Sequence, residues 1–340
     1  MKLTKTIIFT LVIALVMSLM LAACAGNVVP GDDQTAQPPD IPQACEIYEE
    51  QQYPCAPGVT GPGAETAYIP YSALPQTAVI FPLGGGWYYT TASGNRDPNI
   101  EGIFAPLFNR FVELFGRQVM THTQVIIFCD TKAPCPMIMP YVNRYYLRLA
   151  QQSTEYWAQM IYQLSHEMMH FAFFSSFPQY TQSDVAILLD TRRSAWNEEI
   201  IAEAMSLYML RYMADNWQRS PLYQLNPRYG SAIRSYLDYI YNDARKYTRP
   251  LKSEGAYVCR REFHTRFNRT CYANRADHIM ERNHLYNIFV SARAEDIGEI
   301  INAYRYFNND YRYIDYSAWA NNARNPDFIR AISVIQPRLQ

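Results

Sequence analysis

Two histidines and a glutamate stand close together near the middle of the chain, in the stretch His166-Glu167-Met168-Met169-His170. The spacing is H-E-x-x-H, and it falls inside a long apolar run with helical periodicity. On a helix, residues i and i+4 lie on one face, so both imidazoles can reach a single metal ion. Glu167 would then lie beside the metal, where a carboxylate can take a proton from a bound water. The motif therefore predicts a metal-dependent hydrolytic centre.

The surroundings of the motif resemble the zincin metallopeptidases, in which a strand, the H-E-x-x-H helix and a second helix follow one another. In that superfamily the strand before the motif lies at the sheet edge and binds substrate backbone, and Val125 to Phe128 is the expected counterpart. Gln163 departs from the resemblance, because the family often has Val or Thr there. The resemblance implies an α+β, zincin-like fold. A small mixed sheet and the motif helix would form an upper lobe, followed by a mostly helical lower lobe.

A third ligand separates the subclasses of this superfamily, because catalytic zinc usually keeps three protein ligands. A metzincin would continue the motif to a Gly and a third His, and Phe171 to Phe177 contains neither. A gluzincin takes a Glu from a later helix, and Trp196 to Ala204 resembles its pattern W-x-x-E-x-x-A-[DE]. On that resemblance Glu199 is the third ligand of Zn²⁺, and Glu198 is the alternative.

Helical geometry assigns roles to the neighbouring acidic residues. Glu203 lies one turn after Glu199 on the same face, where it could accept a hydrogen bond from a ligating histidine. Glu198 points about a hundred degrees away, so we expect it to be solvated or paired with Arg192 or Arg193. A wholly solvated acidic face is the alternative, and the many apolar residues of this helix argue against it.

The resemblance implies a mechanism of peptide hydrolysis. Zn²⁺ held by His166, His170 and Glu199 would lower the pKa of a bound water, and Glu167 would take its proton as general base. The family also supplies a His or Tyr to stabilise the oxyanion, and His264 has the most similar spacing. The other candidates for that role are His278, His284 and the many Tyr residues.

Other kinds of catalysis lack their signatures. The chain has no G-x-S-x-G elbow, and its cysteines are expected to be oxidised, so serine and cysteine nucleophiles are not favoured. The G-x-M-x-N signature of exopeptidases is also missing, which favours an endopeptidase acting on a peptide or protein. Two alternatives stay open: a non-catalytic structural or binding lipoprotein, and a zinc hydrolase of a non-peptide amide.

The N-terminus has the features of a secretory signal peptide. Lys2 and Lys5 precede an almost wholly apolar run, and Leu21-Ala22-Ala23-Cys24 resembles the lipobox of bacterial lipoproteins. The resemblance implies cleavage before Cys24 and lipidation of that residue, with residues 1–23 removed. Ala25 follows the cysteine rather than Asp, which in Gram-negative lipoproteins implies sorting to the outer membrane. We therefore expect a lipid-anchored protein of the bacterial cell envelope.

Six further cysteines fall into three couples that are close in sequence. Because an even number in an exported chain indicates disulfides, we expect one bond within each couple. The expected bonds are Cys45–Cys55, Cys129–Cys135 and Cys259–Cys271.

Domain boundaries follow from composition. Residues 24–44 form a tether rich in Pro, Gly and polar residues, 45–180 the upper subdomain with the motif helix, and 181–340 the lower subdomain with the third-ligand helix. Lys and Arg number 30 against 31 Asp and Glu, and no basic stripe appears, so nucleic-acid binding is not expected.

Periodicity of the apolar residues predicts the elements that position the motif. Gly84-Gly85-Gly86 is predicted to be a plain turn, since no Lys-Ser/Thr follows to make a phosphate loop. Residues 129–140, with three prolines, are predicted to be a loop. The expected strands are 77–81, 87–91 and 119–128, and the expected helices are 99–115, 155–174, 194–213, 231–247, 276–290, 294–306 and 327–335.

Overall fold

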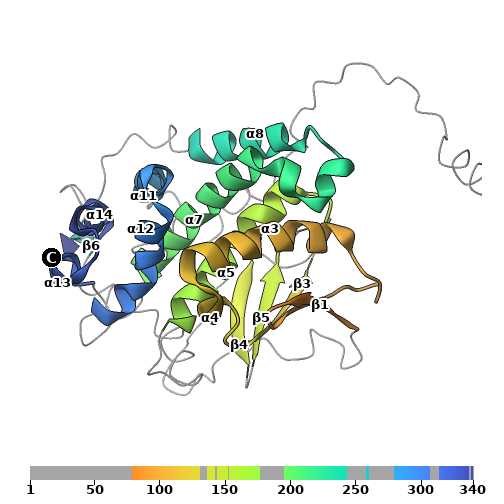
Figure 1. Cartoon of the computed structure of the whole chain (residues 1–340), viewed down its shortest axis with the longest axis horizontal. Coiled ribbons are helices and arrows are strands. Elements are labelled where there is room, and N and C mark those ends of the chain that lie inside the picture. Colours follow the sequence, from red (N-terminus) through yellow and green to blue (C-terminus); the bar gives the residue numbers. More distant parts are fainter. Residues whose placement is uncertain are drawn as a thin grey trace, which may run out of the picture. The chain divides into compact units, whose positions relative to one another are not determined.

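A computed structural model describes residues 79–130, 136–141, 144–151, 153–176, 195–242, 258–259, 279–306, 314–336 and 338–339. All of them belong to one compact unit, Ile41–Gln340. They combine a small mixed sheet with a larger number of helices, which confirms the α+β class (Figure 1). The domain boundaries expected at residues 23, 44 and 180 lie outside the described residues.

The main sheet has five strands in the order β1-β2-β3-β5-β4. β1 and β2 form an antiparallel hairpin, β3 pairs in parallel with both β2 and β5, and β4 pairs antiparallel with β5. Gly84, Gly85 and Gly86 all have positive φ, which glycine adopts without strain, and they make the plain turn that we predicted. The strands are β1 (Ile80–Gly84), β2 (Trp87–Thr90), β3 (Gln124–Cys129), β4 (Met137–Tyr141) and β5 (Arg144–Leu149).

The structure corrects our assignment of the edge strand. Val125 to Phe128 belongs to β3, which pairs on both sides and therefore lies inside the sheet. The edge strands are β1 and β4, and most of β4 lies within a stretch that we predicted to be a loop because of its prolines. Proline is tolerated in an edge strand when the missing N–H would point away from the partner strand. The residues before β3 also differ from the prediction, since Arg117–Met120 form a short helix, α4.

Two long helices pack against this sheet. α3 (Pro98–Phe115) contacts β1, and α5 (Trp157–Ser175) contacts β4 and β5. The carboxylate of Asp97 accepts a hydrogen bond from the Asn99 N–H at 2.8 Å and caps α3, while Gly116, with φ 88°, ends it. The indole of Trp157 donates to Asn99 Oδ1 at 2.9 Å, which joins the first turns of α3 and α5.

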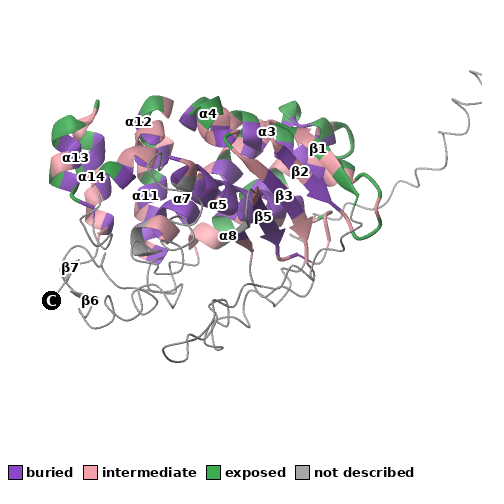
Figure 2. Ribbon diagram, turned by 90° about the horizontal axis from the view of Figure 1, so that it is seen from below, coloured by how far each residue is buried: buried purple, intermediate pink, exposed green. Residues whose placement is uncertain are grey.

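A third long helix, α7 (Ala195–Asp215), packs along α5 and also contacts α8 (Tyr229–Asn242) and α11 (Ile279–Ser291) (Figure 1). Buried residues concentrate where α5, α7 and the central strands meet (Figure 2). Trp87 of β2 lies at the middle of this core, with its ring 5.0 Å from that of Phe171 and 5.5 Å from that of Phe104.

The C-terminal part is built from short elements. The helix expected at 294–306 is a short α-helix, α12 (Ala294–Gly298), followed by the 3-10 helix η7 (Glu299–Tyr306). Within the described ranges, no helix is long and apolar enough to cross a membrane. The other elements are η2 (Trp217–Arg219), η3 (Pro221–Gln224), α13 (Tyr316–Asn322), α14 (Pro326–Ile332), η8 (Ser333–Ile335) and a two-stranded sheet of β6 (Val258–Cys259) and β7 (Arg338–Leu339).

Candidate metal centre

Two contacts fix the rotation of α5 about its axis and thereby determine which way the residues of its H-E-x-x-H motif face. Phe171 turns one face of the helix toward the sheet, where its ring lies 5.5 Å from that of Tyr145 in a perpendicular arrangement. The Gln163 amide accepts from the Ala150 N–H at 2.9 Å and donates to the Ala150 carbonyl at 2.8 Å. The residue that departs from the zincin pattern therefore ties the motif helix to the end of β5.

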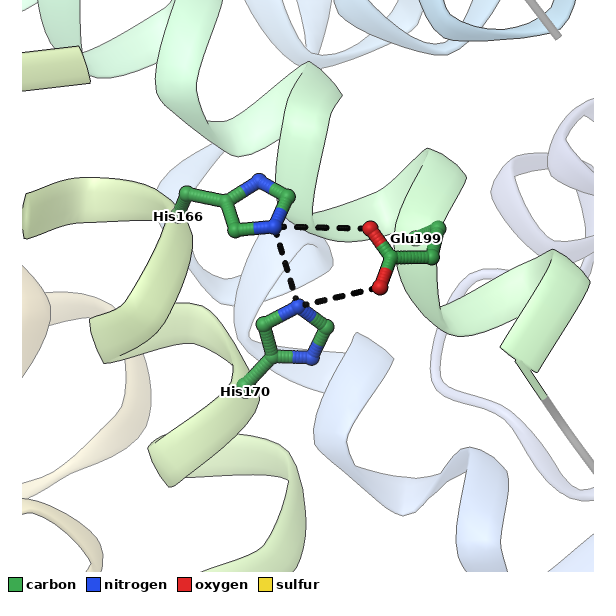
Figure 3. Close-up of side chains that lie close together, drawn as sticks. All are labelled: His166, His170 and Glu199. Atoms are coloured by element: carbon green, nitrogen blue, oxygen red, sulfur yellow. Dashed lines mark hydrogen bonds and ion pairs between the residues drawn. The ribbon is translucent and has the colours of Figure 1, made fainter. Parts of the chain in front are cut away.

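The face of α5 that turns toward α7 carries His166 and His170, and Glu199 meets them from α7 (Figure 3). The two Nε2 atoms are 3.1 Å apart. Glu199 Oε2 lies 3.4 Å from Nε2 of His166, and its Oε1 lies 3.7 Å from Nε2 of His170. The structure thus brings together the three residues that the sequence suggested as metal ligands.

The spacing of these atoms suits a small tetrahedral cation. An ion bonded at about 2.0–2.1 Å to each ligand holds the ligand atoms about 3.3 Å apart in a tetrahedral arrangement. The measured separations of 3.1, 3.4 and 3.7 Å bracket that value. Two imidazoles and one carboxylate are also a common donor set of catalytic zinc. The His166, His170 and Glu199 side chains therefore fit Zn²⁺.

Electrostatics at the cluster favour positive charge. Burial opposes ionisation of Glu199, but its hydrogen bond with His166 and the charge of His170 lower its pKa to about 2. Burial also opposes the charged form of His170, but Glu198, Glu199 and Glu167 outweigh it and raise the pKa of His170 to about 10. In the metal-free protein a proton on His170 supplies the positive charge, and a metal ion has to displace it.

Glu198 has a role that the sequence did not reveal. Its Oε1 lies 2.5 Å from Nδ1 of His170, and the two side chains are only 11% and 9% exposed. A carboxylate that accepts the Nδ1–H proton leaves Nε2 of the same ring available for a metal. We had expected Glu198 to be solvated or paired with Arg192 or Arg193, and both arginines lie outside the described residues.

Glu203 has a partner that the sequence did not suggest. Its Oε2 lies 3.5 Å from Nη1 of Arg282, a residue of α11 that is 1% exposed. The hydrogen bond that we expected between Glu203 and one of the two histidines stays a prediction, and Nδ1 of His166 has no hydrogen-bond partner among the described residues. Arg282 also donates to the Ile240 carbonyl at 2.9 Å and so joins α7, α8 and α11.

Glu167 lies inside the protein beside the cluster. It is 3% exposed, and burial raises the pKa of its carboxyl group. The backbone of Ile138 in β4 makes a hydrogen bond to this carboxylate that lowers the pKa, which identifies the Ile138 N–H as the donor. The edge strand and the motif helix therefore meet at Glu167.

Several predicted site residues fall outside the described ranges: Cys24, Cys45, Cys55, Cys135, His264, Cys271 and His278. Cys259 lies in β6, and His284 lies on α11, outside the metal-ligand group. Cys129 is half-buried in β3, and burial raises the pKa of its thiol to about 12, while its expected disulfide partner Cys135 lies outside the described residues. The three disulfides and the role of His264 stay predictions.

Comparison with known proteins identifies no relative of this chain. No family model matches it, and neither a curated protein nor a solved structure does. Its function therefore has to be inferred from the geometry of the centre itself.

Proposed function

We propose that this chain is a zinc-dependent metallopeptidase of the gluzincin type with a zincin-like fold. One observation carries the proposal: His166, His170 and Glu199 converge at 3.1–3.7 Å, with Glu167 buried beside them. A structural cation needs ligands alone, whereas a hydrolytic one also needs a base within reach. The glutamate next to the first ligand meets that second need.

Each residue then has a defined task. His166, His170 and Glu199 would hold Zn²⁺, which when bound polarises a carbonyl oxygen and lowers the pKa of water. Glu167 takes a proton from the attacking water and passes it to the amine that leaves when the C–N bond breaks. Burial raises the pKa of Glu167, which makes its carboxyl group a better proton carrier near neutral pH. Glu198 holds the His170 ring with its Nε2 facing the ligand cluster.

We also propose that the protein is anchored to the bacterial cell envelope through lipid on Cys24 and sorted to the outer membrane. The support is the sequence alone, with the signal-like residues 1–23 and the Leu21-Ala22-Ala23-Cys24 stretch. The compartment outside the inner membrane is oxidising, in keeping with the three proposed disulfides. Mass spectrometry of the membrane fraction should find the N-terminal peptide starting at a lipidated Cys24.

Zinc content and hydrolysis, measured on purified wild-type protein and two variants, test the proposed activity. The wild type should carry one zinc ion and cleave labelled casein. Glu199→Ala should lose the zinc, whereas Glu167→Gln should keep it and lose cleavage. The proposal is wrong if the wild type holds no zinc, or if Glu167→Gln cleaves casein at the wild-type rate.

Two alternatives give different results in the same measurements. A non-catalytic binding lipoprotein cleaves nothing, so Glu167→Gln would have no measurable effect on function. A hydrolase of non-peptide amides would hold zinc without cleaving casein, and would release product from a cell-wall amide in a manner that depends on Glu167.

A further inference from the structure

The two histidines of the candidate metal centre are supported unequally. Both rings turn Nε2 toward Glu199 (Figure 3). Nδ1 of His170 lies 2.5 Å from Oε1 of Glu198, whereas Nδ1 of His166 is buried and has no hydrogen-bond partner among the described residues. A neutral ring whose Nε2 faces a metal ion carries its proton on Nδ1, and a buried N–H without an acceptor costs free energy. Metal binding at His166 therefore calls for an acceptor at its Nδ1.

The motif helix and the helix of the proposed third ligand run in opposite directions. Trp157, in the first turn of α5, lies beside Trp217, which follows the end of α7, with their ring centroids 5.5 Å apart. Toward the other ends of the two helices, Glu198 in the first turn of α7 contacts His170 in the second half of α5. The helices α5 and α7 therefore pack antiparallel.

This antiparallel packing brings another acidic residue to the level of the unsupported ring. One turn back along α5 leads from His170 to His166, and one turn forward along α7 leads from Glu199 to Glu203. Glu203 is buried, and it lies on the same face of α7 as Glu199. Among the acidic residues of α7, Glu203 is therefore the one best placed to accept a hydrogen bond from the Nδ1–H of His166.

A buried arginine attracts the same carboxylate. Nη1 of Arg282 lies 3.5 Å from Oε2 of Glu203, which is longer than the roughly 2.7–2.9 Å of a strong charge-assisted hydrogen bond. The other two nitrogens of the guanidinium hold Arg282 at the junction of α8 and α11, because Nη2 donates to the Ile240 carbonyl at 2.9 Å and Nε donates to Asn283 Oδ1 at 3.1 Å. The contact with Glu203 is the longest of these three, so it is the one most readily exchanged.

We propose that Arg282 is a positioning residue of the metal centre, which competes with the Nδ1–H of His166 for the carboxylate of Glu203. This inference rests on the proposed metal centre. While Arg282 attracts Glu203, the ring of His166 lacks its acceptor and the metal is held less tightly. Arg282 thus acts through Glu203 and not on the metal itself. The affinity of the centre for its metal then depends on the junction of α8 and α11, two helices that supply none of the proposed ligands.

Neutralising the arginine tests this competition. Arg282→Gln removes the charge and keeps a donor for the Ile240 carbonyl. We expect it to bind zinc roughly tenfold more tightly than the wild type, because the outer partner of a ligating histidine typically contributes roughly 10- to 100-fold to metal affinity. Its thermal midpoint should nevertheless be lower, since contacts at the helix junction are lost. Competition with a fluorescent chelator measures the affinity, and a merely structural role of Arg282 would not produce tighter binding in a less stable protein.

Asn283→Ala is the matched control for the junction. Nδ2 of Asn283 donates to the Tyr241 carbonyl at 2.7 Å, one residue from the carbonyl that Arg282 contacts. This variant should also have a lower thermal midpoint, but it should bind zinc with the affinity of the wild type.

A second measurement follows the Nδ1–H itself, because loss of a positive charge also favours a nearby cation directly. In the cobalt-substituted protein, proton NMR resolves the exchangeable N–H of each ligating ring, and Glu198→Ala identifies the His170 signal by accelerating its exchange. The His166 signal should exchange roughly tenfold more slowly in Arg282→Gln than in the wild type. In the double variant Glu203→Leu/Arg282→Met, which removes both competing groups, it should exchange at the wild-type rate.

Either of two results would overturn the inference: zinc affinity in Arg282→Gln no higher than in the wild type, or an unchanged exchange rate of the His166 N–H. If Arg282→Gln does not fold, the wild type decides. There the His166 N–H should exchange faster than that of His170, and equally slow exchange would show that Glu203 already holds the ring. A wild type that binds neither zinc nor cobalt would refute the proposed function itself.

Discussion

Replacing Glu198 tests how the proposed metal centre is held, because this residue contacts His170, one of the proposed ligands. Its Oε1 lies 2.5 Å from Nδ1 of His170, and it is 11% exposed. A hydrogen bond to a charged group contributes about 1.5–3 kcal/mol, which corresponds to roughly 10- to 150-fold in an equilibrium constant. Loss of the outer partner of a ligating histidine typically costs roughly 10- to 100-fold in metal affinity. We therefore expect Glu198→Ala to weaken zinc binding at least tenfold, and Glu198→Gln to weaken it less.

The size of this loss should depend on pH in a direction that the structure fixes. Zinc has to displace a proton from His170, whose pKa in the metal-free protein is raised to about 10. Without Glu198 the pKa of His170 falls. At pH 7 the free-energy cost of displacing its proton is therefore smaller in the variant than in the wild type. The difference in zinc affinity should therefore be smaller at pH 7 than at pH 9.

Competition against a fluorescent zinc chelator between pH 6.5 and 9 measures these affinities. Glu295→Gln, on α12, is the control, because this carboxylate is 45% exposed and paired with the exposed Arg293. Thermal midpoints of the chelated proteins exclude a folding defect. Zinc affinity equal to the wild type in both Glu198 variants would refute the reasoning, as would a loss that is the same at every pH.

Three further changes test the packing and charge of the centre. Phe171→Ala removes a fully buried ring between Trp87 and Tyr145, which costs about 3–5 kcal/mol and lowers the thermal midpoint by roughly 10 °C; a shift below about 3 °C would contradict this packing. Gln163→Leu leaves the Ala150 backbone without both hydrogen bonds, at a cost of about 2 kcal/mol that should appear in a urea titration as a lower midpoint with an unchanged slope. The chelated protein should lose stability as the pH rises from 6.5 toward 10, because the raised pKa of His170 stabilises the fold below 6.5 and this contribution disappears as the proton is lost. A calorimetric midpoint that stays constant from pH 7 to 9.5 would disagree with that charge arrangement.

The long amphipathic helices could be predicted from the sequence, because each buries a continuous face against the rest of the molecule. The helices expected at 99–115 and 155–174 differ from α3 and α5 by at most two residues at either end. The strand β4 could not be predicted, since the prolines before Tyr141 indicate a loop. Proline disfavours a strand only where its N–H is needed, and an edge position does not need it.

The residues of the proposed metal centre likewise divide into those that could be predicted from the sequence and one that could not. His166 and His170 follow from helical spacing, and Glu199 follows from the resemblance of its helix to a known pattern. The contact between Glu198 and His170 could not be predicted from the angular position of Glu198 on α7 alone, because a histidine ring has two nitrogens on opposite sides. Glu199 lies near Nε2 of His170, and Glu198 reaches Nδ1 of the same ring. Only the relative placement of α5 and α7 shows that one ring can engage both neighbours.

The buried pair of Glu203 and Arg282 bears on how this sequence can change over evolutionary time. Removing one partner of a buried ion pair is usually strongly destabilising, whereas replacing both with apolar residues of similar volume is often neutral. Substitutions at the two positions should therefore occur together, although 79 residues separate them in the chain. A related sequence without an acid one turn after Glu199, the proposed third ligand, would not for that reason lack the proposed metal centre. The residue to compare at such a site is the one just before the ligand, where Glu198 stands.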